Sequence, residues 1–410
     1  MKFLNEGRVH VKMWLDDVED SALKQINNLA DLPFAFHHVA IMPDCHSGYG
    51  MPIGGVLATK GVVLPNAVGV DIGCGMCAVK TSLRAEQLDK ETLKKIMGKI
   101  REVIPVGKDH QKEKQDDSLM PKGECDWVWD YPGIYPVVSR EYQSVLHQLG
   151  TLGGGNHFIE VQKDQEGFVW IMIHSGSRNL GKKVADHYNK IAKDLNERWY
   201  SQIPQEWDLA FLPIETTEAK GYMREMRYCV DFALANRKLM LQKIIHCFET
   251  GITDKAIFED KSDYCYGGAE DLELMINIAH NYAAWEHHFK EDVIVHRKGA
   301  TLAREGTVGI IPGSQGSKSY IVWGKGNPDS FMSCSHGAGR KMSRSKACAT
   351  LVVQEEIEKL DSQGIVHGIR HQQDLDEASG AYKNIDDVME NQKDLVEIVT
   401  ELQPLAVIKG

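Results

Sequence analysis

Asp71 and Cys74 lie three residues apart in the glycine-rich segment GVDIGCGM (69–76), where they could hold a metal ion together. A carboxylate and a thiolate are both metal ligands, and glycines beside them leave room for an ion. A tight turn around a buried cysteine has the same pattern, so the spacing leaves both interpretations open. Cys77 forms a C-x-x-C pair with Cys74, but the chain has no second such pair, and we expect Cys77 to pack in the core.

Three histidines also lie next to glycines or short polar residues. His157 follows Asn156 in LGTLGGGNHFIEV (149–161), His174 begins HSGSRNLG (174–181), and His280 precedes Asn281. Neutral imidazole is a common metal ligand, although a single histidine at the end of a strand is more often structural. The GGG run could bind phosphate through its N–H groups, but it lacks the lysine of a P-loop.

His336 stands in SCSHGAGR (333–340), a run of small residues that would leave its imidazole accessible. An accessible imidazole suits a nucleophile that attacks phosphorus. Arg340 and Arg344 follow closely, and Arg178 lies in the HSGSR segment. Because a guanidinium can donate two parallel hydrogen bonds to a phosphate, we expect these arginines to bind phosphate groups.

The overall composition restricts the possible functions. The net charge of −11 argues against a protein that coats nucleic acid non-specifically, but 47 Lys and Arg residues still allow a local basic groove. The N-terminus has no apolar signal segment, and no run is long enough to span a membrane. Nine scattered cysteines without a framework spacing predict a reducing environment, so we expect a cytoplasmic protein.

The order of secondary-structure elements predicts an α+β fold that forms one domain over residues 1–410. Apolar periodicity predicts a helix from Leu93 to Pro105, a longer one over 217–248 and a third over 269–289 that contains His280. Apolar runs predict strands at 168–173, 292–297 and 319–324. The polar stretch 107–118 predicts a mobile surface loop.

Taken together, these motifs closely resemble the RtcB family of RNA ligases. The resemblance runs from about Val11 to the last residue and rests on DCHSGYG, GVDIGCGM, GGGNHFIE, HSGSR, HN, PGSQG, SCSHGAGR and VIKG in this order. It implies an α+β domain with a deep polar pocket. It also implies that the protein uses GTP and two Mn²⁺ ions to join RNA 3′-phosphate or 2′,3′-cyclic phosphate ends to 5′-hydroxyl ends, in tRNA splicing or RNA repair.

The resemblance assigns roles to individual residues. Cys74, His157 and His174 would hold one ion, Asp71, Cys74 and His280 would hold the second, and His336 would carry the guanylyl group. The residues implied to bind the nucleotide are Asn156, His157, Phe158, Ile159, Glu160, His280, Asn281, Pro312, Gly313, Ser314, Gln315, Ser319, His336, Gly337, Ala338, Gly339, Tyr382 and Lys409. Glu160 and Lys409 suit the edge of a guanine base, and Arg178, Arg340 and Arg344 are our candidates for holding RNA phosphates.

Two alternatives and two departures accompany this assignment. A dinuclear metal phosphoesterase could use the same ligands, and a non-catalytic RNA or nucleotide sensor could keep the same pocket. Gln315 stands where we expect methionine in relatives, and the 107–118 loop differs from the expected version. We expect a monomer that does not bind membranes, with archease as a candidate activating partner.

Overall fold

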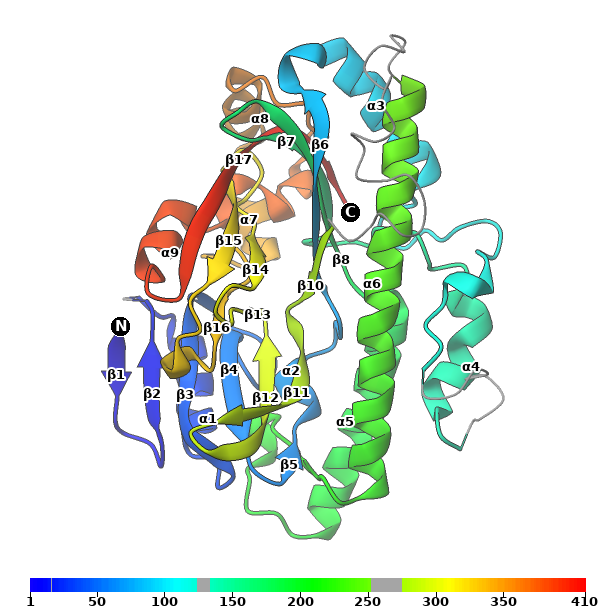
Figure 1. The fold of residues 1–410 in the computed structure, drawn as a ribbon. Helices are drawn as coiled ribbons and strands as arrows, with labels where there is room; N and C mark the ends of the chain where they lie inside the picture. Colours follow the sequence, from blue (N-terminus) through cyan, green and yellow to red (C-terminus); the bar gives the residue numbers. More distant parts are fainter. Residues whose placement is uncertain (16, 124–132, 252–274) are drawn as a thin grey trace.

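The computed structural model describes residues 1–15, 17–123, 133–251 and 275–410. Its described part is mixed α+β, as predicted, with two large β-sheets and helices packed around them (Figure 1). Two two-stranded sheets complete the β-structure in this part of the chain: β13 (Ala300–Leu302) with β16 (Ser333–Ser335), and β5 (Val62–Val63) with β9 (Leu212–Pro213). No helix among these residues is long and apolar enough to cross a membrane.

The first large sheet has six strands in the order β1-β2-β3-β4-β12-β11. Their bounds are β1 Lys2–Leu4, β2 His10–Met13, β3 Ala35–His46, β4 Ile53–Thr59, β12 Glu291–Lys298 and β11 Asn281–His288. Strands β2 and β3 run parallel, and the other neighbours are antiparallel. Helix α1 (Asp20–Ala30) joins β2 to β3 and buries one apolar face, with Ile26 and Leu29 completely inaccessible. This sheet carries the 44–50 segment at the end of β3.

The second large sheet has seven strands in the order β10-β6-β8-β7-β17-β15-β14, and all neighbours are antiparallel. Their bounds are β10 Ile276–Ala279, β6 Gly75–Arg84, β8 Phe168–Ser175, β7 Phe158–Lys163, β17 Val396–Lys409, β15 Ser319–Gly324 and β14 Val308–Ile311. Side chains alternate between the two faces of a strand. Ile159 and Ile173 therefore face one core, whereas Phe158 and Met172 face the other.

Besides α1, the α-helices in the described part of the chain are α2 Pro65–Val68, α3 Lys90–Val103, α4 Pro136–Val145, α5 Arg178–Arg198, α6 Thr217–Gly251, α7 Arg344–Thr350, α8 Val353–Ser362 and α9 Ile385–Asn391. Helix α6 is the long helix in Figure 1, and it packs with α3 against the Ile159 face of the seven-stranded sheet. Met240 and Ile244 from α6 and Ile96 from α3 are completely buried there. This packing fixes α6 behind the strand ends that carry the candidate ligands.

Most of the predicted elements are confirmed. The helices predicted from Leu93 and over 217–248 are α3 and α6, and the three predicted strands lie in β8, β12 and β15. Residues 107–118 form an exposed connection that has no helix or strand before Asp117. Cys77 is buried in the core, as expected.

The helix predicted over 269–289 is wrong for its described part, and residues 269–274 lie outside the described residues. Residues from Ile276 onward form β10 and β11, with His280 between them. Glu286 and His288 point into the protein, where they pair with each other and Glu286 pairs with Arg297. Because the buried positions are polar, the alternation typical of a strand is not visible in the sequence.

Candidate metal and nucleotide site

Four neighbouring strands bring the predicted metal ligands to one edge of the seven-stranded sheet. Cys74 directly precedes β6, His157 directly precedes β7, His174 lies near the end of β8, and His280 directly follows β10. Because these strands are antiparallel, two of them begin and two end at the same edge. The register pairs His174 with Phe158 on β7 and with Met76 on β6. The topology therefore explains how Cys74, His157, His174 and His280 meet although they are far apart in the chain.

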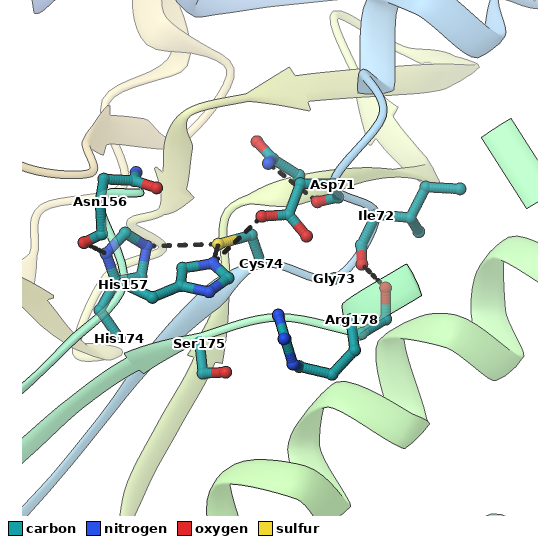
Figure 2. Close-up of polar contacts among 12 residues, drawn as sticks. Asp71, Ile72, Gly73, Cys74, Asn156, His157, His174, Ser175 and Arg178 are labelled. Carbon is teal, nitrogen blue, oxygen red and sulfur yellow. Dashed lines mark hydrogen bonds and ion pairs between the residues drawn. The ribbon is translucent and has the colours of Figure 1, made fainter. Parts of the chain in front are cut away.

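Cys74, His157 and His174 form the tightest group. The Sγ atom of Cys74 lies 3.3 Å from Nε2 of His157 and 3.2 Å from Nε2 of His174, and all three residues are buried (Figure 2). Ligands at usual zinc–sulfur and zinc–nitrogen bond lengths lie about 3.5 Å apart in a tetrahedral site. The three atoms lie within 4.8 Å of one another, so they fit one metal ion.

Backbone carbonyl groups orient both imidazoles. Nδ1 of His157 lies 3.0 Å from the carbonyl oxygen of Leu152, and Nδ1 of His174 lies 3.1 Å from that of Asn156. Since a carbonyl only accepts hydrogen bonds, each Nδ1 is the donor, and each Nε2 faces the other members of the group. This is the arrangement that a metal-ligating histidine usually has.

Asp71 and His280 extend this group on either side. Oδ2 of Asp71 lies 3.2 Å from Nε2 of His157, and Nε2 of His280 lies 3.4 Å from Nε2 of His174. Nδ1 of His280 is buried and has no hydrogen-bond partner in the described part of the chain. The structure thus brings all five predicted ligands together, and the unpartnered nitrogen leaves a donor atom for a cation.

The protonation states fit metal binding. Burial lowers the pKa of His174 and of His280 well below the usual range, so both rings are neutral at pH 7. Burial raises the pKa of the Cys74 thiol, and the nearby Asp71 charge raises it further. A thiolate at this position therefore needs a cation next to it, since the surroundings alone oppose its charge.

His336 lies next to this group and is held by Asp44. Oδ2 of Asp44 lies 2.6 Å from Nδ1 of His336 and also accepts the backbone N–H of His336 at 3.0 Å. The rings of His336 and His280 lie 4.7 Å apart, centroid to centroid. Asp44 is completely buried, whereas the His336 side chain is 13% exposed. The sequence motif contained Asp44, but we predicted no role for it.

A pocket of about 840 Å³ opens beside His336. It is lined by thirteen of the residues predicted to bind the nucleotide: Asn156, Phe158, Glu160, Pro312, Gly313, Ser314, Gln315, His336, Gly337, Ala338, Gly339, Tyr382 and Lys409. His174 also lines it, so the pocket adjoins the metal-ligand group. The volume of the pocket and the polar side chains among its lining residues suit a nucleotide-sized ligand.

The other predicted nucleotide residues lie around the pocket and do not line it. The Ile159 side chain faces the α6 core, and Ser319 is buried behind the pocket, where its Oγ accepts the Gly313 N–H at 3.2 Å. Asn281 donates to the carbonyl oxygen of Asp71 at 3.0 Å. His157 and His280 belong to the metal-ligand group. Asn281 and Ser319 thus support the two parts of the site from outside the pocket.

Glu160 and Lys409 both line the pocket, and the charge of each affects the pKa of the other. Burial raises the pKa of Glu160 to about 7, and the charge of Lys409 opposes this rise. Burial lowers the pKa of Lys409, and Glu377 and Glu160 oppose that effect. Oε2 of Glu160 accepts from Gln162 at 2.7 Å. A carboxyl group that titrates near neutrality can recognise a hydrogen-bond donor in a pH-dependent way.

Glu377 forms ion pairs with Arg340 and Arg344, two arginines that line the pocket. Its carboxylate lies 2.7 Å from Nη1 of Arg340 and 2.6 Å from Nε of Arg344, and it accepts a hydrogen bond from the Tyr382 hydroxyl. Gln315 donates to the Glu377 carbonyl oxygen at 2.9 Å. Glu377 was not predicted, because QQDLDEAS (372–379) has no recognisable motif. His46 and Glu19 also line the pocket without having been predicted.

Arg178 lies close to Asp71 and Cys74 of the metal-ligand group (Figure 2). It begins α5 with a φ of 58°, a backbone conformation that costs energy for any residue except glycine. Its Nε donates to Oγ1 of Thr151 at 2.9 Å, and Nη2 donates to the carbonyl oxygen of Gly107 at 2.9 Å. Arg178 therefore connects the 107–118 loop to the site.

The fold and this site define a protein that can hold a metal ion beside a nucleotide-sized polar pocket. Comparison with known proteins then identifies its family: the model of the family described as tRNA-splicing ligase RtcB matches residues 25–410. The chain belongs to the RtcB family and is an RNA ligase of that family. This membership decides against the phosphoesterase and sensor interpretations.

Individual relatives match over nearly their whole length. The RNA-splicing ligase RtcB of Escherichia coli (strain K12) is 39% identical over 420 residues, which cover 100% of this chain and 99% of that protein. The tRNA-splicing ligase RtcB of Thermococcus kodakarensis is 31% identical and covers 100% of this chain and 96% of its own length. The tRNA-splicing ligase RtcB of Methanococcus maripaludis is 32% identical over 98% of this chain and 95% of its own length.

Proposed function

We propose that this ligase uses GTP and Mn²⁺ to join RNA ends bearing a 3′-phosphate or 2′,3′-cyclic phosphate to 5′-hydroxyl ends, in tRNA splicing or RNA repair. The relatives are named for RNA splicing and tRNA splicing. The observation that carries the proposal is the Asp44–His336 pair, which opens into a nucleotide-sized pocket beside the buried ligand group. A hydrolase would not need an oriented, accessible histidine at this place.

His336 is the proposed nucleophile. In this role, the Asp44 carboxylate accepts a hydrogen bond from the Nδ1–H group of His336. The lone pair of Nε2 is then free to attack. Nε2 attacks the α-phosphorus of GTP and forms a P–N bond while the bond to the leaving pyrophosphate breaks. Asp44 then stabilises the positive charge that the imidazole gains, as the carboxylate of a catalytic triad does.

Two further displacements complete the reaction. An oxygen of the RNA 3′-phosphate attacks the guanylyl phosphorus, and the P–N bond breaks to release His336. The 5′-hydroxyl then attacks the activated 3′-phosphorus, gives up its proton, and releases GMP as a phosphodiester forms. A 2′,3′-cyclic end has to be opened by water to the 3′-phosphate before it can enter this sequence.

The five-residue ligand group is proposed to hold two Mn²⁺ ions, one with Cys74, His157 and His174 and one with Asp71, Cys74 and His280. Bound there, the ions would neutralise charge on the phosphates. The short distances among these donors and the unpartnered Nδ1 of His280 support this assignment. A thiolate and imidazoles by themselves favour zinc. The proposal of manganese therefore rests on the family and not on the ligand set.

The pocket is proposed to bind GTP, with Glu160 and Lys409 at the guanine edge and Tyr382 near the base. The Pro312–Gln315 turn and the Gly337–Gly339 run would contact the remaining parts of the nucleotide through backbone groups. Asn156 would lie between the base and the metal ligands, since its carbonyl oxygen orients His174. Of the residues predicted from the sequence to bind the nucleotide, all line the pocket directly except Ile159, Ser319, Asn281, His157 and His280.

We propose that RNA phosphates reach Arg344, Arg340 and Arg178, which would reconcile RNA binding with a net charge of −11. The Arg344 side chain is 53% exposed and therefore accessible to a phosphate. We also propose that residues 1–410 act as one ligase unit, because the pocket takes His46 from the six-stranded sheet and Glu160 from the seven-stranded sheet. A monomer and an activating partner such as archease remain expectations of this proposal.

A ligation assay with defined RNA ends tests the proposal. RNA with a 3′-phosphate and RNA with a 5′-hydroxyl should be joined only when GTP and Mn²⁺ are both present. RNA with a 3′-hydroxyl and a 5′-phosphate serves as the control and should not be joined. Joining of the control pair, or joining without GTP, would contradict the proposed end chemistry.

A further inference from the structure

Helix α6 contains two consecutive polar residues, Asn236 and Arg237, that are completely buried although neither is a predicted metal or nucleotide ligand. Burial lowers the pKa of Arg237 to about 10, so the guanidinium is still charged at neutral pH. Within the described part of the chain, the hydrogen bonds of this charged group all end on uncharged oxygens. A buried charge without a carboxylate partner is costly, so its position needs an explanation.

The oxygens that Arg237 contacts belong to the segments that carry the metal ligands. Nη1 donates to the carbonyl oxygen of Gly73 at 3.1 Å and to that of Ser175 at 2.7 Å. Nη2 lies 3.4 Å from the carbonyl oxygen of Ile278. Gly73 directly precedes Cys74, Ser175 directly follows His174, and Ile278 lies two residues before His280. One guanidinium thus joins three of the four ligand-bearing segments.

Nε of the same guanidinium strengthens the link to β10. It donates to Oδ1 of Asn277 at 2.7 Å, and the Asn277 amide donates back to the carbonyl oxygen of Leu234 in α6 at 3.2 Å. The position of β10, which ends just before His280, is therefore set by three hydrogen bonds to α6 besides its pairing with β6.

Asn236 binds the fourth ligand-bearing segment, which leads to His157. Its Oδ1 accepts the N–H groups of Gly150 at 2.7 Å and Thr151 at 3.2 Å, and its Nδ2 donates to the Thr151 carbonyl oxygen at 3.1 Å and to Oγ of Ser175 at 3.2 Å. The next residue, Leu152, supplies the carbonyl that orients His157. Asn236 thereby links the support of His157 to the strand that carries His174.

We propose that Asn236 and Arg237 are positioning residues that set the distances among the metal ligands, with Arg237 holding the segments of Cys74, His174 and His280. The guanidinium is planar and presents five donors in fixed directions, so it can hold several carbonyl groups in one relative arrangement. A lysine keeps the charge but cannot reproduce that fork. The proposal rests on the candidate metal site and is independent of the RNA ligase chemistry.

Titration of the metal-free full-length protein with Co²⁺ alone tests this role. Thiolate-to-cobalt charge transfer and the d–d bands report affinity and ligand geometry without any ligation assay. Arg237→Lys should bind Co²⁺ about 10- to 100-fold more weakly, with altered d–d bands, because changes beside metal ligands typically have this effect. Its circular dichroism spectrum should match that of the parent protein.

Arg297→Lys is the matched control. Arg297 is also a completely buried arginine, but it pairs with Glu286 and holds Phe331 and Ser333. This variant should lower the unfolding temperature and leave the Co²⁺ affinity within twofold of the parent value. An equal loss of Co²⁺ affinity in both variants would indicate general loosening of the fold and would overturn the proposal.

Asn277→Ala provides a milder change if Arg237→Lys does not fold. It removes one acceptor from the guanidinium and should weaken Co²⁺ binding in the same direction, by a smaller factor. An unchanged affinity and spectrum in Arg237→Lys, or in Asn277→Ala when only that variant folds, would overturn the proposal. Cys74→Ala tests the assignment of the metal site separately from the positioning role of Arg237. Co²⁺ binding that survives this change would show that the metal site itself is misassigned.

Discussion

The carboxylate of Asp44 and the imidazole of His336 form a hydrogen bond in which Oδ2 lies 2.6 Å from Nδ1. The two residues are 292 positions apart in the chain, and the backbone N–H of His336 donates to the same oxygen. Asp44 lies near the end of β3 in the six-stranded sheet, whereas the ring of His336 lies beside His280, which follows β10 of the seven-stranded sheet. The hydrogen bond with Asp44 therefore fixes which imidazole nitrogen is free, and the ring contact with His280 places the proposed nucleophile beside the metal ligands.

Asp44→Asn should lower the rate of self-guanylylation by about 10²- to 10⁴-fold, because the amide no longer fixes the tautomer or stabilises the imidazolium. The KM for GTP should change little, since Asp44 does not line the pocket. Single-turnover transfer of labelled guanylate measures this rate. A rate within threefold of the parent enzyme, in a correctly folded variant, would exclude the proposed role.

Guanylylation should depend on pH through Glu160. Its pKa is raised to about 7, so the carboxyl group is protonated below that pH and accepts hydrogen bonds from guanine only as pH rises above it. The KM for GTP should therefore fall between pH 6 and pH 8. Glu160→Gln should show a higher KM that no longer depends on Glu160 ionisation, which separates this effect from titration of GTP itself. A parent-like pH profile in the variant would argue against guanine recognition by Glu160.

Arg344→Ala should impair RNA joining while it spares guanylylation. The KM for RNA with a 3′-phosphate should rise about 10-fold or more, as expected for one lost hydrogen bond to a charged group. Arg344 also lines the pocket, but Glu377 keeps its contacts with Arg340 and Tyr382, so the KM for GTP should rise much less than the KM for RNA. Arg227→Ala, which removes an exposed arginine paired with Asp231 on α6, is the control. Equal effects on both reactions of Arg344→Ala would contradict an RNA-specific role.

The identity of the metal should separate binding from turnover. Zinc should bind more tightly than manganese, because thiolate and imidazole donors favour zinc. We nevertheless expect little or no ligation with zinc, since the family resemblance implies manganese chemistry. Competition between Zn²⁺ and Mn²⁺, followed by ligation with each ion alone, measures both properties. Robust ligation by the zinc-loaded protein would refute this prediction.

Gln315→Met should raise the KM for GTP about 2- to 10-fold, the range for one neutral hydrogen bond. The substitution removes the amide that donates to the Glu377 carbonyl oxygen, so Glu377 and its arginines should shift. The maximal rate of guanylylation should stay close to the parent value, because the lost hydrogen bond supports Glu377 and not the Asp44–His336 pair. Unchanged GTP binding would show that Gln315 only fills space.

Much of this site could be predicted because its residues lie in short glycine-containing motifs. The structure brings Cys74, His157, His174 and His280 together, although the sequence gives no distances between them, and their role as metal ligands stays a prediction. The motifs could not show which partner His336 has, because Asp44 is brought to it by the six-stranded sheet. Nor could they indicate Glu377, whose role depends on Arg340 and Arg344 folding onto it.

Two features of the structure differ from what the sequence suggested, and both have simple physical causes. The alternation of side chains along β7 turns Ile159 away from the pocket that Phe158 and Glu160 line, and this could have been deduced from the strand period. The helix over 269–289 could not have been rejected so easily. Its residues from Ile276 form strands because β6 and β12 pair with them and Arg297 compensates the buried Glu286.

Incubation with α-labelled GTP and Mn²⁺ tests the central claim most directly, with His336→Ala alongside. Label should stay on the denatured parent chain, be lost in acid, survive alkali and be absent from His336→Ala. Mapping of the label by peptide digestion should place it on His336. A metal-loaded protein that takes up no label, or that is labelled equally in His336→Ala, would contradict the account.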